Sequence, residues 1–273
     1  MYRRSGTLLV VLLVAMAGCV GSFDAIPGAG DGGDSGSGDG EGDSGGGDGD
    51  STDGDSTSDG SSDVVANRTA VLVDAGSYTS TWRLTATEGG TVTSETAYTS
   101  GVDYVNERSH FQSSQTSGGE TASGWEVYSA GDVTYNRYGE GEAASYVVGE
   151  GTFTGTTPFD AGSYVARGGD LAEFERAGTE TFDGVGVTRY VLTERPSWIA
   201  AQQLAEDDVR WTEFTFEVLV DDDNLVRAER WTSTGTQDGV THTIEFSYEI
   251  TGVGATTVDE PAWVGTAREQ NEA

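Results

Sequence analysis

A strict alternation of apolar and polar residues near the end of the chain sets the first limit on the fold. The residues at every second position are apolar or aromatic, apart from one histidine: Val240, His242, Ile244, Phe246, Tyr248 and Ile250. The residues between them are polar. Successive side chains of a β-strand point to opposite faces, so this pattern predicts a strand with one buried face. The fold must therefore contain a sheet.

Weaker versions of the same pattern recur from residue 79 onward. They predict strands near 79–87, 92–99, 102–112, 123–130, 133–138, 144–149, 173–182, 186–194, 209–220 and 225–234. Turn-forming residues separate several of them, including Asp183-Gly184, Asp222-Asp223-Asn224 and Gln237-Asp238-Gly239. Helical spacing predicts a helix over 64–75 with Asp63 as its cap, a second near 159–166, and a third over 196–207 that begins with Pro196.

These elements predict a β-dominated α+β domain with about ten antiparallel strands. A flat sheet of this size would leave one apolar face in water, so the sheet must curl or pack on a second sheet. Only 35% of the residues are hydrophobic, which favours curling. We expect one large curved antiparallel sheet, a half-barrel, with two or three short helices on its concave side.

The charge balance narrows the classes of partner. The chain has 46 acidic residues against 14 basic ones, all arginine, for a formal net charge of −32. Phosphate recognition requires clustered positive charge, so nucleic acid is not an expected partner. Self-repulsion of this size is screened only at high salt, and the composition resembles that of proteins from extreme halophiles.

The first residues are typical of an export signal. Arg3 and Arg4 precede an uncharged apolar run over 8–17, which is too short to span a membrane. Met16-Ala17-Gly18 then places small residues before Cys19, the single cysteine, as in a lipobox. We expect 1–18 to be a signal peptide and Cys19 to carry a lipid that anchors the protein on the extracytoplasmic face of the membrane. General secretory and twin-arginine export both remain open.

A region almost without hydrophobic residues begins a few positions after the cysteine. Residues 28–63 are almost wholly Gly, Asp and Ser. Such a composition offers nothing to bury against chain entropy, so it predicts a disordered tether over 19–63 and a folded domain over 64–273. Asn67-Arg68-Thr69 is an N-glycosylation sequon at the boundary between the two, with Asn67 as the acceptor.

The order of elements and two short motifs carry a family resemblance. The motifs are Val220-Asp-Asp-Asp-Asn-Leu-Val-Arg227 after a strand and V-x-x-P-x-W from Val258 to Trp263. With them, residues 64–265 resemble haloarchaeal lipoproteins of unassigned function. They are more distantly similar to the half-barrel of Lol-type lipoprotein carriers and mycobacterial lipid-binding lipoproteins. The resemblance implies a concave sheet that holds acyl chains and has no catalytic residues.

No set of residues predicts catalysis. Ser44 lies in a GDSGG string, but this string sits inside the tether, without the scaffold that a nucleophile needs. His110 and His242 are the only histidines and form a poor zinc set. We therefore expect no enzyme activity, no cofactor and no metal, and a hydrolase is the least favoured hypothesis.

Aromatic residues on the predicted strands and on the 196–207 helix suggest two other functions. They either fill the core of a structural or interaction lipoprotein of the cell envelope, or line a cavity for a lipid or other apolar ligand, with the helix as its lid. The candidates for the cavity are Trp82, Trp125, Tyr135, Tyr190, Trp198, Ile199, Leu204, Phe216, Phe246 and Tyr248. We expect the ligand-binding function, with the filled core as the alternative.

Overall fold

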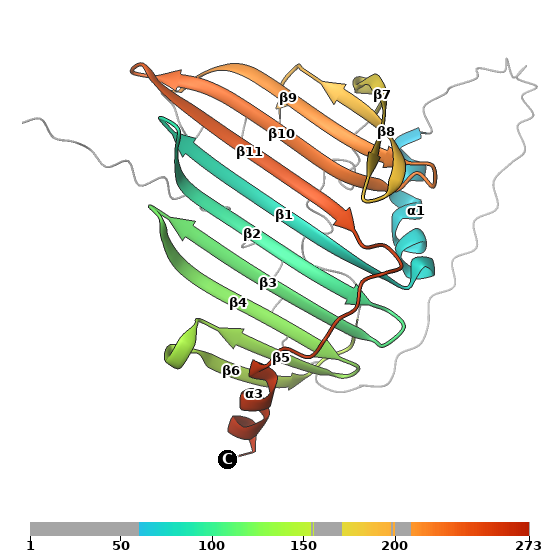
Figure 1. Ribbon diagram of the computed structural model, residues 1–273, viewed down its shortest axis with the longest axis vertical. Coiled ribbons are helices and arrows are strands. Elements are labelled where there is room, and N and C mark those ends of the chain that lie inside the picture. Colours follow the sequence, from blue (N-terminus) through green and yellow to red (C-terminus); the bar gives the residue numbers. More distant parts are fainter. Residues whose placement is uncertain (1–59, 154, 156–170, 198, 200–208, 273) are drawn as a thin grey trace, which may run out of the picture. The chain divides into compact units, whose positions relative to one another are not determined.

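The computed structural model describes residues 60–153, 155, 171–197, 199 and 209–272 (Figure 1). The strands in the first half of the domain are β1 (Ser77–Glu88), β2 (Thr91–Asp103), β3 (Arg108–Ser117), β4 (Glu120–Ala130), β5 (Val133–Tyr138) and β6 (Ser145–Glu150). Those in the second half are β7 (Glu175–Phe182), β8 (Val185–Leu192), β9 (Arg210–Asp221), β10 (Val226–Gln237) and β11 (Val240–Thr251). The described helices are α1 (Gly60–Ala75) and α3 (Trp263–Asn271), with 3-10 turns η1 (Gly141–Ala143) and η4 (Leu171–Glu173).

All eleven strands that the structure describes belong to one antiparallel sheet. Their spatial order is β6-β5-β4-β3-β2-β1-β11-β10-β9-β8-β7, so the sheet is open, with β6 and β7 at its edges. The first and last strands meet in the middle, where Trp82 of β1 pairs with Tyr248 of β11. The two halves of the chain are thereby joined by a contact between residues far apart in sequence. The predicted class, a β-dominated α+β fold consistent with a half-barrel, is confirmed.

The boundary between β2 and β3 differs from the prediction. Strands were expected near 92–99 and 102–112, but β2 continues through Gly101 to Asp103, and the turn lies at 104–107. Asp103 closes that turn through two hydrogen bonds with Asn106. The Asp103 carboxylate accepts one from the backbone N–H of Asn106 at 3.0 Å and one from the Asn106 side-chain amide at 2.7 Å. Glu107 completes it with a φ of 50°.

The predicted turn chemistry is confirmed at three other hairpins. Asp183, Asn224 and Asp238 have positive φ angles of 49°, 59° and 52°, a conformation that Asp and Asn adopt more readily than most residues. Gly76, with φ of 80°, ends α1 and donates its N–H to the carbonyl of Val73 at 3.0 Å. Glycine is favoured at this position because a helix end in the left-handed conformation has no room for a Cβ.

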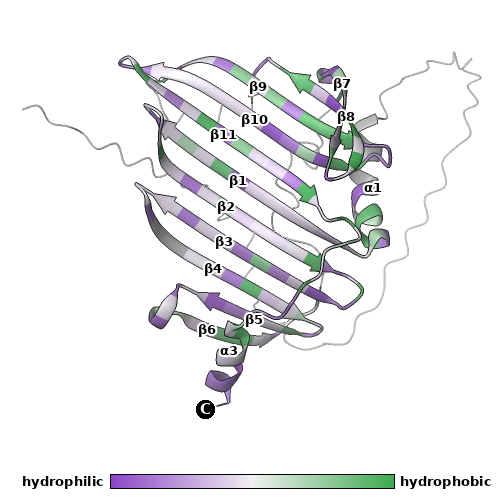
Figure 2. Cartoon of the chain, in the orientation of Figure 1, coloured by the Kyte–Doolittle hydropathy of each residue, from purple (hydrophilic) through white to green (hydrophobic). Residues whose placement is uncertain are grey.

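The sheet has two faces of different character. We call inner the face that carries Trp82, Phe216 and Tyr248, because the largest buried cluster forms there and includes Leu72 of α1. The outer face carries Arg83, Thr81 and their neighbours in register. Hydrophobic and hydrophilic residues alternate along the strands, as Figure 2 shows. This alternation places most of the core on one side of a single sheet.

The helices lie on opposite faces. α1 begins at Gly60, earlier than the predicted Val64, and packs Leu72 into the inner cluster. α3 was not predicted. After β11 the chain crosses the outer face, and Val264 and Ala267 of α3 pack against Tyr128 and Tyr135, beside β5 and β6 (Figure 1).

The predicted helix at 159–166 lies outside the described residues, as does most of the one at 196–207. No helix in the part of the chain that the structure describes is long and apolar enough to span a membrane.

Candidate functional site

A row of aromatic rings crosses the inner face and is the main candidate for a binding surface. The register of the strands places one ring from each of eight neighbouring strands on this face. We call these residues the aromatic row: Tyr138, Trp125, Phe111, Tyr98, Trp82, Phe246, Trp231 and Phe214.

Neighbouring rings of the aromatic row contact each other across the strands. At its centre, Trp82 lies 5.0 Å from Tyr98 and 5.6 Å from Phe246, measured between ring centroids. Phe246 stacks on Trp231 at 5.7 Å with planes 20° apart. Centroid distances between 4.5 and 7 Å are typical of favourable aromatic pairs. The row is therefore a continuous apolar surface.

Exposure changes along the row. Phe111, Trp82, Trp231 and Phe246 are between 6% and 9% exposed, whereas Tyr138 near the β6 edge is 46% exposed. Burial also raises the pKa of the Tyr98 hydroxyl, which indicates apolar surroundings in the middle of the row. The row thus runs from a buried centre to an exposed end at β5.

A polar group lies on the inner face beside the row. Arg68 of α1 donates a hydrogen bond to the Tyr248 hydroxyl, and its guanidinium lies 5.4 Å from the centroid of that ring. Glu229, which is fully buried, pairs in register with Tyr248. This group attaches α1 to the centre of the sheet.

The structure brings together most of the predicted cavity residues. Seven lie on the inner face or in its buried cluster: Trp82, Trp125, Tyr190, Ile199, Phe216, Phe246 and Tyr248. Tyr135 does not join them, because neighbouring residues of β5 face opposite sides, and it packs on the outer face under α3. Trp198, Leu204 and Cys19 lie outside the described residues, and the side chain of Asn67 is likewise not described.

The outer face has a polar centre that the sequence analysis did not predict. Glu126 accepts hydrogen bonds from the Trp263 indole at 2.8 Å, Arg137 at 2.8 Å and His110 at 3.1 Å. Partial burial acts to raise the pKa of Glu126, but the hydrogen bonds from Trp263, His110 and Gln112 outweigh it and lower that pKa. Because these partners already hold the carboxylate, the group ties α3 to the sheet.

The histidines and carboxylates form no metal site among the described residues, where no group of three or more potential ligands was found. His110 is engaged with Glu126 on the outer face, and His242 lies on the inner face opposite Glu88 in the β1–β11 register. The two histidines are therefore on different faces of the sheet.

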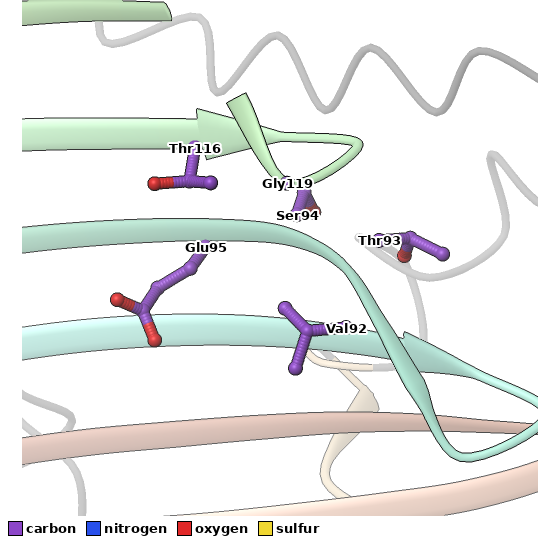
Figure 3. Close-up of a pocket in the computed structure, with 6 residues that line it drawn as sticks. All are labelled: Val92, Thr93, Ser94, Glu95, Thr116 and Gly119. Atoms are coloured by element: carbon purple, nitrogen blue, oxygen red, sulfur yellow. The ribbon is translucent and has the colours of Figure 1, made fainter. Parts of the chain in front are cut away.

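A shallow pocket of about 230 Å³ lies at the turn ends of β2, β3 and β4 (Figure 3). It is lined by Val92, Thr93, Ser94, Glu95, Thr116 and Gly119. It contains no residue of the aromatic row. A second crevice, between Trp82, Tyr98, Phe111 and Tyr248, is too narrow for a water molecule, with about 0 Å³ open to one.

Fold and site together define a protein with one open antiparallel sheet and an aromatic inner face. The chain belongs to a family of unknown function (DUF7537), whose profile matches residues 4–267. No curated protein matches its sequence.

Several solved structures are similar. The lipoprotein LppX of Mycobacterium tuberculosis is 13% identical, with 72% of this chain and 99% of that chain covered and a TM-score of 0.31. LprF from Mycobacterium bovis is 11% identical, with 74% of this chain and 96% of that chain covered and a TM-score of 0.36. A LolA superfamily protein from Nitrosomonas europaea is 9% identical, with 75% of this chain and 96% of that chain covered and a TM-score of 0.22. Likeness at this level concerns the fold alone.

Proposed function

We propose that this protein is a membrane-anchored extracytoplasmic lipoprotein that binds a lipid or another apolar ligand on the inner face of its sheet, without catalysis. The anchor is the lipid expected on Cys19, and the acidic tether over 19–63 extends the domain from the membrane. The membrane and the apolar ligand are then its partners.

The aromatic row is the observation that carries this proposal. One ring from each of eight strands forms a continuous apolar surface, and its exposed end at Tyr138 offers a way onto it. Ligand sites in proteins are mostly apolar and aromatic, with a few polar groups that orient the ligand. Three further rings of the row, Tyr98, Trp125 and Phe214, are only partly buried. Their exposed parts provide area that a ligand can contact.

The alternative is a structural or interaction lipoprotein with a filled core. One specific observation favours it: Trp82, Trp231 and Phe246 are at most 9% exposed, and the crevice beside Trp82 is too narrow for water. In that case the rings contribute to stability alone, and the domain acts through its surface.

Native mass spectrometry of protein purified in high salt distinguishes the two functions. Binding predicts a co-purified lipid, and it also predicts uptake of cis-parinaric acid, a fluorescent fatty acid. The filled core predicts neither. If no lipid co-purifies and the probe does not bind, ligand binding is refuted and the structural function is supported.

A matched pair of variants tests whether the ligand binds on the inner face. Tyr98 and Thr99 are neighbours on β2 whose side chains lie on the inner and outer face respectively. Tyr98→Ala should weaken binding of the probe by about tenfold, because it removes a large contact surface. Thr99→Ala should leave binding unchanged. Equal effects of the two variants would contradict binding on this face.

A further inference from the structure

Trp125 carries a buried polar atom that no described residue satisfies. Its indole Nε1 is buried and has no hydrogen-bond partner in the part of the chain that the structure describes. A buried donor without an acceptor destabilises a protein by about 1–3 kcal/mol, so such atoms are uncommon and call for an explanation. Here the residue lies on the inner face, next to the exposed end of the aromatic row.

The surroundings of Trp125 are aromatic. The ring of Phe111 lies 5.1 Å away at 62°, and the ring of Tyr138 lies 6.3 Å away and almost parallel, at 2°. Among the described residues, Arg137 and Glu126 form the ion pair nearest to Trp125 in register, and this pair is on the outer face. Trp125 thus presents a neutral donor within an apolar surface.

We infer that the Trp125 Nε1–H is the polar anchor of the inner-face site and donates a hydrogen bond to an uncharged oxygen of the ligand. The ligand class is then an acyl lipid with an ester-type carbonyl, rather than a bare hydrocarbon or a free carboxylate. The inference rests on the proposed function and specifies its ligand.

One physical reason favours a neutral oxygen. A neutral indole supplies one hydrogen bond but no positive charge, and a carboxylate placed among aromatic rings would lose its hydration without an ionic partner. An ester carbonyl accepts the same hydrogen bond without this loss.

Tyr138 is the part of the structure that must move. The stacked ring is 46% exposed and belongs to the last residue of β5, which Gly139 follows with a φ of 80°. A half-exposed ring at the end of a strand is held by fewer contacts than the rings at the centre of the row. Its displacement would open the side of Trp125 that it now covers.

The test uses Trp125→Phe, which keeps an aromatic ring but removes the donor. Three probes are titrated in high salt: cis-parinaric acid methyl ester, cis-parinaric acid, and the hydrocarbon diphenylhexatriene. Binding is read from the probe's own anisotropy, because the variant alters tryptophan emission. Trp125→Phe should weaken the ester by about five- to tenfold and change the hydrocarbon by less than about twofold.

The control is Trp263→Phe, the same substitution on the outer face, which should leave binding of all three probes unchanged. Equal losses for ester and hydrocarbon, or no loss for either, would overturn the role of the indole. Two results together would overturn the inference that the acceptor is a neutral oxygen. The unaltered protein would bind the free acid more tightly than the ester, and Trp125→Phe would weaken binding of the free acid alone.

These results are distinguishable from failure of the proposed function. If none of the three probes binds to the unaltered protein, the binding function itself fails. Thermal unfolding gives a readout that is independent of ligand: Trp125→Phe should lower the unfolding temperature less than Trp263→Phe, which removes the same atoms and also a hydrogen bond. A decrease as large as that of Trp263→Phe would show that the Trp125 indole is satisfied within the fold and would overturn the inference.

Discussion

The indole of Trp263 donates a hydrogen bond of 2.8 Å to Glu126, and this contact joins the C-terminal helix to the middle of β4 across 137 residues of sequence. The same carboxylate also holds His110 and Arg137. A single acidic side chain thus connects three strands of the outer face to α3.

Removal of this hydrogen bond should destabilise the domain. Trp263→Phe keeps most of the ring that stacks on Tyr146 but removes the donor. Hydrogen bonds to charged groups contribute about 1.5–3 kcal/mol, so we expect the free energy of unfolding to fall by roughly that amount. Urea unfolding in high salt measures it. Glu269→Gln, on the exposed side of α3, should have no effect, and a similar loss there would contradict the role of the bond.

Acid should destabilise the outer face through Glu126. Its folded-state pKa lies below the usual 4.5, so its stabilising contribution is complete above about pH 4.5 and is lost as the pH falls through the folded-state value. Asp103 and Glu260, whose pKa values are also lowered, change in the same direction. Urea unfolding between about pH 7 and about pH 3 should show this loss.

A variant separates Glu126 from the other carboxylates. Glu126→Gln cannot ionise, so its stability at neutral pH should be lower and should decrease less between about pH 4.5 and pH 3. A pH profile parallel to that of the unaltered protein would show that Glu126 does not contribute.

Helix α1 offers a matched pair for testing its attachment to the inner face. Leu72 is 3% exposed and packs in the main cluster, whereas the adjacent Val73 is 45% exposed. Leu72→Ala should reduce the free energy of unfolding by about 2–5 kcal/mol, because it removes buried methyl groups and leaves a cavity. Val73→Ala should cost well under 1 kcal/mol. Similar effects at both positions would contradict this packing.

Salt should stabilise the protein against unfolding over a wide range of salt concentration. The net charge of −32 produces repulsion that extends about 10 Å at 0.1 M salt and about 3 Å at 1 M. We expect the urea midpoint to rise between about 0.1 M and about 2 M KCl. Sorbitol at matched osmolarity is the control, and a midpoint that rises equally with sorbitol would exclude screening as the cause.

The anchor predicted at Cys19 can be tested in cells. Cys19→Ser removes the thiol to which the lipid would be attached, so the variant should appear in the medium or remain unprocessed. Fractionation and the mass of the mature chain measure this. A variant that is still membrane-bound and normally processed would refute the lipid anchor.

The strands could be predicted because apolar and polar residues alternate along a strand that has one buried face. Val240–Thr251 is the clearest case, and β11 has those bounds. The short β5 shows where the approach fails: Tyr135 and Tyr138 are both aromatic but face opposite sides, so the sequence of that strand does not indicate which ring is on the inner face. Trp125 could be listed as a candidate, but nothing local indicates that its Nε1 lacks a partner.

The sequence by itself determined the class of fold, the positions of most turns and the acidic surface, because each depends on neighbouring residues or on composition. Only the tertiary structure decided that β1 pairs with β11, that eight rings align in one row, and that α3 packs on the outer face. These features depend on register between segments distant in the chain. A shift of one residue would turn every ring of a strand to the other face, and no local pattern specifies that choice.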